Sequence, residues 1–174
     1  RSAKAVNFGI VYGISDFSLA GDIGVSRKEA RAYIDGYLGH YTGVKAYMKN
    51  VVDEAREKGY VETSYGRRRS LPELKSTNFN VRSGAERMAL NTPIQGTAAD
   101  IIKLAMIRVR NRMQKEQLSA RLVLQVHDEL IVECPEQEAE AVMQLITEEM
   151  TSAAQLKVPL VADAHMGRSW YEAK

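Results

Sequence analysis

The chain has 174 residues, a length that fits one domain with a hydrophobic core and argues against two independent domains. Of these residues, 45% are hydrophobic and 26% are charged, a composition that excludes a disordered chain. The net charge of +2 is too small to indicate a nucleic-acid partner by itself. A single cysteine, Cys134, excludes an internal disulfide and a zinc site built from cysteine clusters.

The sequence also lacks targeting signals. It contains no apolar run of about 18 residues, and no basic segment followed by an apolar stretch opens it. We therefore expect a cytoplasmic protein with no membrane partner. The first residue is Arg rather than Met, and no N-cap residue precedes the first predicted helix, so we expect the chain to begin inside a larger protein.

Helical patterns fill the first third of the chain. Residues 2–13 predict a helix that ends at Gly13, because glycine tolerates the left-handed conformation of a helix C-cap. A short helical piece is expected over residues 16–21. Residues 26–38 predict a helix opened by the S-x-x-E spacing of a capping box, and residues 43–58 predict another with one apolar face.

After residue 58, the spacing of apolar residues no longer follows a helical period. Residues 59–71 predict a small hairpin, with its turn at Tyr65–Gly66. Residues 79–91 read as a helix. The letters TPIQ that follow place Pro93 at the first position of a new helix, which continues to about Lys115. We expect these two helices to meet at a sharp bend.

The last third of the chain mixes strands and a helix. Two apolar runs, RLVLQV and LIVE, flank His127-Asp128-Glu129 and predict two buried antiparallel strands joined by a tight turn. Pro135 opens a helix of about 18 residues, and VPLVADAH predicts a final strand. The order of elements indicates an α+β fold, with helices first and a small sheet covered by a helix after them.

The strongest chemical candidate is the turn itself. Asp128 and Glu129 place two carboxylates at the tip of a hairpin with apolar strands, and carboxylates suit a hard cation such as Mg²⁺. Alternatively, Asp128 only makes the turn, because Asp is a favoured turn residue. No motif marks a second segment that could supply a metal-binding carboxylate. A two-metal site would therefore need a further carboxylate ligand from outside this chain.

A second candidate is a stripe on the first helix. Lys4, Phe8 and Tyr12 recur at intervals of four and share one side of a helix. Aromatic residues at this spacing usually pack in a core. Lys4 argues otherwise, since an ammonium one turn from a ring suits a triphosphate and its base, and Arg1 could add charge to the same side.

Other polar residues leave two explanations open. The arginines of GRRRS suit either a solvated hairpin tip or a nucleic-acid backbone. Gln95 could complete a capping box in TPIQ, and Asn91 could end a helix. Arg82 and Arg87 could form a solvated helical face.

Three stretches in a fixed order resemble the family A DNA polymerases, the bacterial DNA polymerase I family. KAVNFGIVYG resembles most of motif B in the fingers helix, AERMALNTPIQGTAADIIK resembles two palm helices, and QVHDE resembles motif C. The resemblance covers essentially the whole chain. It implies an α+β fold, with a mostly helical fingers segment and part of a palm that carries a small antiparallel sheet.

The resemblance implies a role for each stripe residue. Lys4 contacts the phosphates of the incoming deoxynucleoside triphosphate, Phe8 lies by its sugar and base, and Tyr12 stands near the templating position. Phe at position 8 is the family's form that disfavours dideoxynucleotides. Lys4 is also a candidate acid for the leaving pyrophosphate.

The same resemblance makes Asp128 one of two metal-binding aspartates, with Glu129 as an auxiliary carboxylate. The residues expected to touch the primer-template are Arg82, Arg87, Asn91, Gln95 and His127. The implied reaction is attack of the primer 3′-hydroxyl on the α-phosphate, with release of pyrophosphate and two Mg²⁺ ions in the complete enzyme. Closure of the fingers helix would gate this chemistry.

In domain terms, the resemblance assigns residues 1–76 to the fingers, with the nucleotide-binding helix at 1–13 and the hairpin near 59–71. Residues 77–174 become the C-terminal part of the palm. Motif A and the thumb are absent, so we expect an N-terminal part of the polymerase as a partner and no activity from the isolated chain. The expected setting is DNA replication and repair at the bacterial nucleoid. The alternative is a non-catalytic helical nucleic-acid-binding module.

Overall fold

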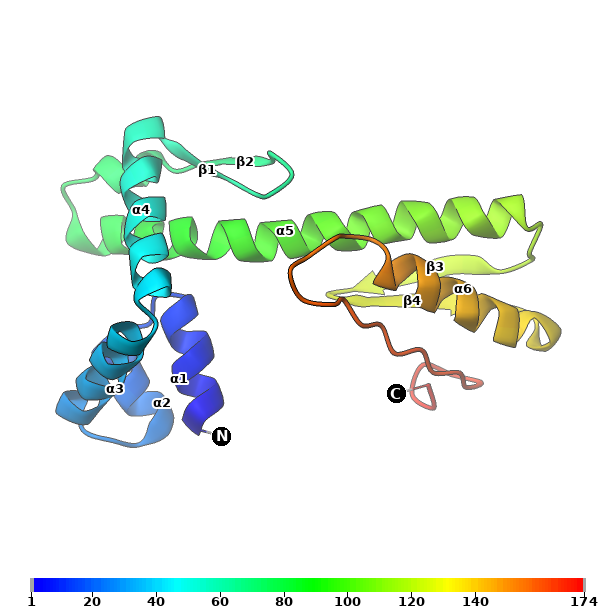
Figure 1. Ribbon diagram of the computed structural model, residues 1–174, viewed down its shortest axis with the longest axis horizontal. Helices are drawn as coiled ribbons and strands as arrows, with labels where there is room; N and C mark the ends of the chain where they lie inside the picture. The colour runs from blue at the N-terminus through cyan, green and yellow to red at the C-terminus, as the bar shows by residue number, and fades with distance from the viewer. Residues whose placement is uncertain (1, 174) are drawn as a thin grey trace. The chain divides into compact units, whose positions relative to one another are not determined.

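The computed structural model describes residues 2–173, so Arg1 and its predicted contribution lie outside the described residues. The chain divides into two compact units, at Thr97 and Ala98 (Figure 1). Each unit contains helices and a two-stranded antiparallel sheet. The α+β fold predicted from the sequence is therefore confirmed.

The first unit is mostly helical. Its elements in chain order are α1 (Ser2–Val11), α2 (Asp16–Ile23), α3 (Arg27–His40), α4 (Thr42–Lys58), β1 (Tyr60–Glu62), β2 (Arg68–Ser70), the 3₁₀ turn η1 (Pro72–Lys75) and the beginning of α5 (Phe79–Lys115). Strands β1 and β2 form the predicted hairpin, with Val61 opposite Arg69.

Local sequence signals set the helix ends in this unit. Gly13 takes a φ of +74° just after α1, as the C-cap pattern predicts. The capping box before α3 is present in both directions: Ser26 Oγ accepts from the Glu29 N–H at 3.2 Å, and Glu29 Oε2 accepts from the Ser26 N–H at 2.9 Å. These bonds hold the pKa of Glu29 below its ordinary value, with the Ser26 side chain as the larger cause.

One hydrophobic core joins α4, the hairpin, η1 and the first part of α5. Its buried members are Ala55, Val61, Leu71, Leu74, Ala85 and Ala89. Leu19 of α2 and Ala30 of α3 are also fully buried. Because α5 supplies small alanines here, other elements can approach it closely.

Helix α5 corrects a prediction: the chain forms one helix from Phe79 to Lys115 with Pro93 inside it, so the two bent helices are wrong. Proline lacks the N–H that would bond an earlier carbonyl, and this loss usually breaks a helix. Here the Thr92 hydroxyl donates to the Met88 carbonyl at 2.7 Å, and the Thr97 hydroxyl donates to the Pro93 carbonyl. Tertiary packing on the buried alanines therefore outweighs the local signal for a break.

The second unit places a helix over a hairpin. Its elements are the remainder of α5, β3 (Arg121–Val126), β4 (Glu129–Glu133), the 3₁₀ turn η2 (Glu136–Glu138) and α6 (Ala139–Thr151). Strands β3 and β4 pair antiparallel with an irregularity between Leu122 and Leu124. A buried cluster joins α5 and α6, namely Val109, Met113, Ala120, Val142 and Leu145, and apolar residues of both strands pack against it.

Two strand predictions are wrong in this unit. The hairpin strands are only partly buried, with Val123 54% and Leu124 47% exposed. VPLVADAH forms no strand, and neither does any other described residue after Thr151. A strand needs a neighbour for its backbone hydrogen bonds. Apolar alternation alone therefore could not make one, and Val158 and Val161 are 67% and 74% exposed.

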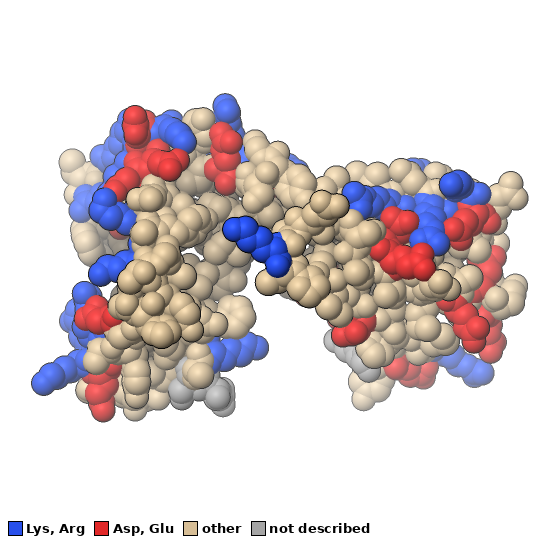
Figure 2. Space-filling view, viewed as in Figure 1, with Lys and Arg blue, Asp and Glu red and all other residues tan. Residues whose placement is uncertain are grey.

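The surface of each unit mixes both signs of charge. Figure 2 shows Lys and Arg interspersed with Asp and Glu on the visible face of each. This mixing agrees with the small net charge of the sequence. Among the described helices, none is long and apolar enough to cross a membrane.

Candidate functional site

The predicted stripe exists: Lys4 and Phe8 of α1 are exposed, and Tyr12, just after the helix, is half-buried. Lys4 Nζ lies 5.7 Å from the centroid of the Phe8 ring, and the Phe8 and Tyr12 rings lie 6.4 Å apart at 38°. Phe8 is 50% exposed, whereas Ile10, on the opposite side of the helix, is buried. The core explanation for Phe8 is therefore wrong, and a cation and an aromatic face stand together on a free surface.

A second stripe runs along α5. Arg87, Asn91 and Gln95 follow at intervals of four and share one face. Because the helix does not restart at Pro93, the Thr92 hydroxyl bonds backward to a carbonyl and makes no cap. The Gln95 side chain is exposed, and Asn91 lies in the interior of the helix. Capping therefore explains neither residue.

The two stripes come together at Gly13. A Cβ added to Gly13 would lie 3.0 Å from Leu90 Cδ1 and 3.4 Å from Arg87 Cγ. The end of α1 that carries Tyr12 therefore lies against the start of the α5 stripe. Glycine is required here both for this close approach and for the positive φ.

Asn91 carries a polar atom without a partner. Its Oδ1 is buried and accepts no hydrogen bond from the described residues. A buried acceptor of this kind costs free energy unless something supplies a donor. The position of Asn91 between Arg87 and Gln95 makes it the centre of the α5 stripe.

Arg82 and the arginines of the β1–β2 hairpin contact other groups within the first unit. Arg82 donates to the Ser76 carbonyl at 2.9 Å, away from the α5 stripe. Arg68 pairs with Glu62 at 2.9 Å. Arg69 reaches α5, where its guanidinium lies 3.0 Å from Met88 Sδ. The hairpin arginines are thus not simply a solvated tip.

In the second unit, the predicted turn is built from His127 and Asp128. These residues join Val126 to Glu129, which pair across the hairpin. His127 has a φ of +53°, as the first position of such a two-residue turn requires, although glycine is the usual residue there. The Gln125 side-chain amide donates to the His127 carbonyl at 2.6 Å. The backbone that presents Asp128 is therefore held in a strained but fixed form.

The carboxylates at this turn are exposed and have no competing cation. Among residues 2–173, neither Asp128 nor Glu129 has an ion pair or a side-chain hydrogen bond. Among the described residues, the Asp128 side chain therefore makes no Asx-turn hydrogen bond. The described residues also contain no group of three or more His, Cys, Asp or Glu side chains that could hold a metal ion. The turn offers oxygen ligands but does not complete a coordination shell by itself.

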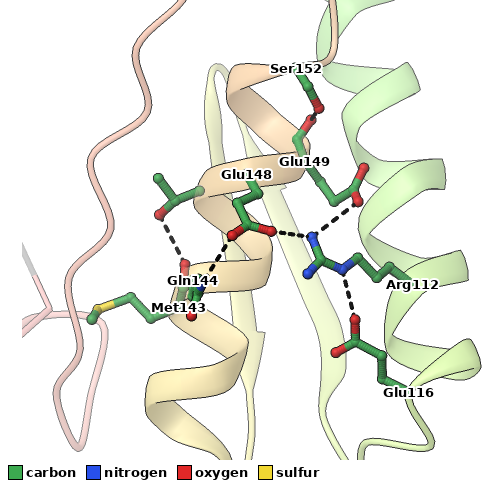
Figure 3. A network of polar contacts seen from close by, with 8 residues as sticks. Arg112, Glu116, Met143, Gln144, Glu148, Glu149 and Ser152 are labelled. Carbon is green, nitrogen blue, oxygen red and sulfur yellow. Dashed lines mark hydrogen bonds and ion pairs between the residues drawn. The ribbon is translucent and has the colours of Figure 1, made fainter.

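An ion-pair network fastens the helices beside this hairpin. Figure 3 shows Arg112 of α5 between Glu116 of its own helix and Glu148 and Glu149 of α6. The N···O distances are 2.8, 2.6 and 3.4 Å, respectively. These contacts raise the pKa of Arg112, with Glu116 as the largest cause, and lower that of Glu148, with Arg112 as the largest cause. The network is structural, since it engages no turn residue.

Comparison with known proteins identifies the family. The sequence profile described as DNA polymerase family A matches residues 1–172. This chain belongs to DNA polymerase family A. The DNA polymerase I proteins of Bacillus caldotenax and Bacillus subtilis (strain 168) are each 59% identical to it over 174 residues. Both alignments cover all of this chain and 20% of the relative, so this family A chain spans about a fifth of the length of those curated relatives.

A solved structure agrees with this family A assignment. The chain is similar to the structure described as "POL domain of Pol1 from M. smegmatis complex with DNA primer-template and dNTP". The TM-score is 0.94 with 47% sequence identity, and the match covers 99% of this chain and 30% of the other.

Sequence patterns missed two contacts around the family A motifs. The Tyr37 hydroxyl on α3 donates to Asn7 Oδ1 on α1 at 2.6 Å, across 30 positions of sequence. No local spacing links residues so far apart. The bond from Gln125 to the His127 carbonyl was also missed, although a two-residue turn without glycine signals that its backbone needs support.

Proposed function

We propose that this chain is the C-terminal part of a DNA-directed DNA polymerase, with residues 1–76 in the fingers and 77–174 in the palm. The complete enzyme would add deoxynucleotides to a primer 3′-end, under the direction of a template, and release pyrophosphate. The observation that carries the proposal is the meeting of the α1 and α5 stripes at Gly13 in a family A chain. Its setting would be replication and repair of DNA in the bacterial cytoplasm.

The α1 stripe would grip the nucleotide. Lys4 supplies a point charge for the triphosphate, and Phe8, one turn away and half exposed, supplies a ring for the sugar and base. Tyr12 would stand beside the templating base. Lys4 and Phe8 lie on α1, and Tyr12 follows it directly with its N–H bonded to the Phe8 carbonyl. A movement of α1 would therefore bring all three to a correctly paired nucleotide together.

The α5 stripe would read the primer-template. Arg87 and Gln95 are exposed donors. Asn91 lies between them with a buried Oδ1 that accepts no hydrogen bond from the described residues, and a change of its side-chain rotamer would turn this acceptor toward the groove. The minor groove offers acceptors on every base pair and a donor, the guanine amino group, at G·C pairs. The donors of Arg87 and Gln95 would meet the groove acceptors, and the Asn91 oxygen would meet the guanine amino group. Arg82 would make a weaker contact with the primer-template, because its guanidinium already donates a hydrogen bond to the Ser76 carbonyl.

The turn in the second unit fits a hard divalent cation. Asp128 and Glu129 present free carboxylate oxygens, and Mg²⁺ prefers a few carboxylates together with substrate phosphates. When bound, the ions would neutralise charge on the reacting phosphates. Asp128 would be the principal ligand and Glu129 an auxiliary one. His127 would lie near the primer terminus, on the backbone that Gln125 holds.

Lys4 would have a further role in this proposal. An ammonium bound to the leaving pyrophosphate can give up its proton as charge develops there. The primer 3′-hydroxyl would give its proton to solvent water as its oxygen bonds the α-phosphorus. The bond from the α-phosphorus to the pyrophosphate oxygen would break at the same time, and that leaving oxygen would take the Lys4 proton.

Primer extension tests the proposal with two polypeptides. The first is this chain alone, which we expect to be inactive because the turn supplies only part of a metal site. The second is an intact polymerase polypeptide that carries this chain as its C-terminal part. There, Asp128→Ala should lower single-turnover extension by about a thousandfold or more while DNA binding remains, because it removes a principal metal ligand.

Glu133→Gln is the matched control. It changes a carboxylate at the other end of the same hairpin, where Glu133 pairs with Arg121 in solvent. Its activity should equal that of the parent enzyme. Robust extension by the isolated chain would overturn the expected inactivity. Full activity of Asp128→Ala would instead favour a non-catalytic nucleic-acid-binding module.

A further inference from the structure

Helix α1 is held in its own unit mostly by apolar contacts. Among its described side chains, Ile10 is buried, whereas Lys4 and Phe8 face solvent. Ala5, Val6 and Val11 are half-buried, and Gly13 just after the helix lies against Leu90 and Arg87. Apolar contacts of this kind are non-directional, so they leave a small rotation of α1 about its axis possible. Such a rotation would turn Lys4 and Phe8 away from a bound nucleotide without breaking the core.

A hydrogen bond adds a directional contact between α1 and α3. The Tyr37 hydroxyl donates to Asn7 Oδ1 at 2.6 Å. At about 100° per residue, Asn7 lies about 60° around the helix from Lys4 and about 60° from Ile10. The bond therefore acts at the border between the buried side and the exposed stripe, where it opposes rotation of the helix.

Tyr37 is itself firmly placed. Its ring packs on that of Tyr41, with centroids 4.8 Å apart at 46°, and Tyr41 packs edge-on against His40. The Tyr41 N–H also donates to the Tyr37 carbonyl at 2.8 Å. Tyr41 occupies the corner between α3 and α4, and α4 enters the core of the unit. The bond thus connects α1 to the ring cluster at the junction of α3 and α4.

We propose that Tyr37 is a positioning residue for the nucleotide, acting through Asn7 to set the rotation of α1. This inference rests on the proposed function, since it assumes that Lys4 and Phe8 bind the nucleotide. Tyr37 touches no reacting atom. Its effect should therefore appear in the apparent affinity for the deoxynucleoside triphosphate and leave turnover at saturation nearly unchanged.

The test is steady-state and single-turnover extension by the intact polymerase with the Tyr37→Phe substitution, which removes only the hydroxyl. A hydrogen bond of ordinary strength corresponds to about a two- to tenfold change in an equilibrium constant. We expect KM for the nucleotide to rise by about that factor, with kcat changed less than about twofold and primer-template affinity unchanged.

Two further variants separate positioning from general damage. Asn7→Ala should raise KM as Tyr37→Phe does, and the double variant should be no worse than either single one, because both remove the same bond. Asn7→Asp keeps an acceptor oxygen and should restore most of the affinity. Tyr33→Phe, one turn earlier on α3 and 52% exposed, is the matched control and should equal the parent enzyme.

The outcomes distinguish this inference from the proposed function. If Lys4→Met weakens the nucleotide but Tyr37→Phe leaves KM unchanged, the positioning role is wrong and the proposed function survives. Additive losses in the double variant, or an equal fall in kcat and DNA affinity, would also overturn it. If the intact polypeptide extends no primer, or if Lys4→Met has no effect, the proposed function itself fails.

Discussion

The two units present their candidate groups in different ways. In the first unit, groups are spread along helical faces at intervals of four, and their positions depend on how helices pack. In the second unit, one carboxylate sits on a two-residue turn and the other on the first residue of β4, and strand pairing and Gln125 fix the backbone there. The first arrangement suits a long ligand, because groups spaced over several helical turns can contact such a ligand along its length. Holding an ion suits the second, because neighbouring oxygens need little adjustment.

The largest expected effect on the first arrangement comes from Lys4→Met. Loss of a charged contact to phosphate typically costs between about thirtyfold and several thousandfold in binding. In the intact polymerase we expect KM for the nucleotide to rise within that range, and kcat to fall if Lys4 also donates a proton. Rapid-quench measurements separate the two. Unchanged turnover with weaker binding would contradict the acid role.

Leu145→Ala should destabilise the second unit. Leu145 is 1% exposed and packs with Val109 and Met113 between α6 and α5. Truncation of a buried leucine costs about 2–5 kcal/mol. Hydrogen exchange should show the loss in peptides from residues 98–173 and little change before Thr97. Val123→Ala, on an exposed strand position, is the control and should leave exchange nearly unchanged.

Gly96→Ala should break the close packing of the first unit. A Cβ at position 96 would lie 2.5 Å from Thr63 Cγ2 in the hairpin turn region. Overpacking of this kind costs about 1–3 kcal/mol. Thr63→Ser removes the clashing methyl but keeps the hydroxyl that accepts from the Tyr65 and Arg67 N–H groups. The double variant should therefore recover most of the stability in denaturant unfolding; no recovery would refute this account.

Arg112→Met should give the smallest effect, because its ion pairs are open to solvent. Arg112 lowers the pKa of Glu148 below its ordinary 4.5. A lowered pKa in the folded state gives stability that is present above the unfolded pKa and lost as pH falls through the folded one. The difference in free energy of unfolding between the parent and Arg112→Met should thus be largest at neutral pH and should disappear as the pH falls below about 4.5.

Arg110→Met, an exposed neighbour on α5, serves as the control for that pH series. It should follow the parent curve throughout. A gap that stays constant as the pH falls would show that Arg112 stabilises through packing of its carbon chain, with no contribution from Glu148.

Sequence patterns predicted much of the fold because the signals were local. The capping box at Ser26, the glycine at 13 and the tight turn between the last two strands each depend on a few neighbouring residues, and all three are confirmed, although Glu129 belongs to β4 rather than to the predicted turn. The break at Pro93 and the strand at VPLVADAH were wrong because each depends on what packs or pairs with the segment. The domain boundary and the site roles stay predictions.

The sequence by itself determined the stripes, since a spacing of four fixes which residues share a helix face, and it determined the carboxylates at the turn. Only the tertiary structure decided that Phe8 faces solvent, that Gly13 brings the end of α1 against α5, and that Asn91 keeps an unpartnered oxygen. The reason is range: helical periodicity is a property of the chain, whereas exposure and the Tyr37 contact to Asn7 depend on segments that meet only after folding.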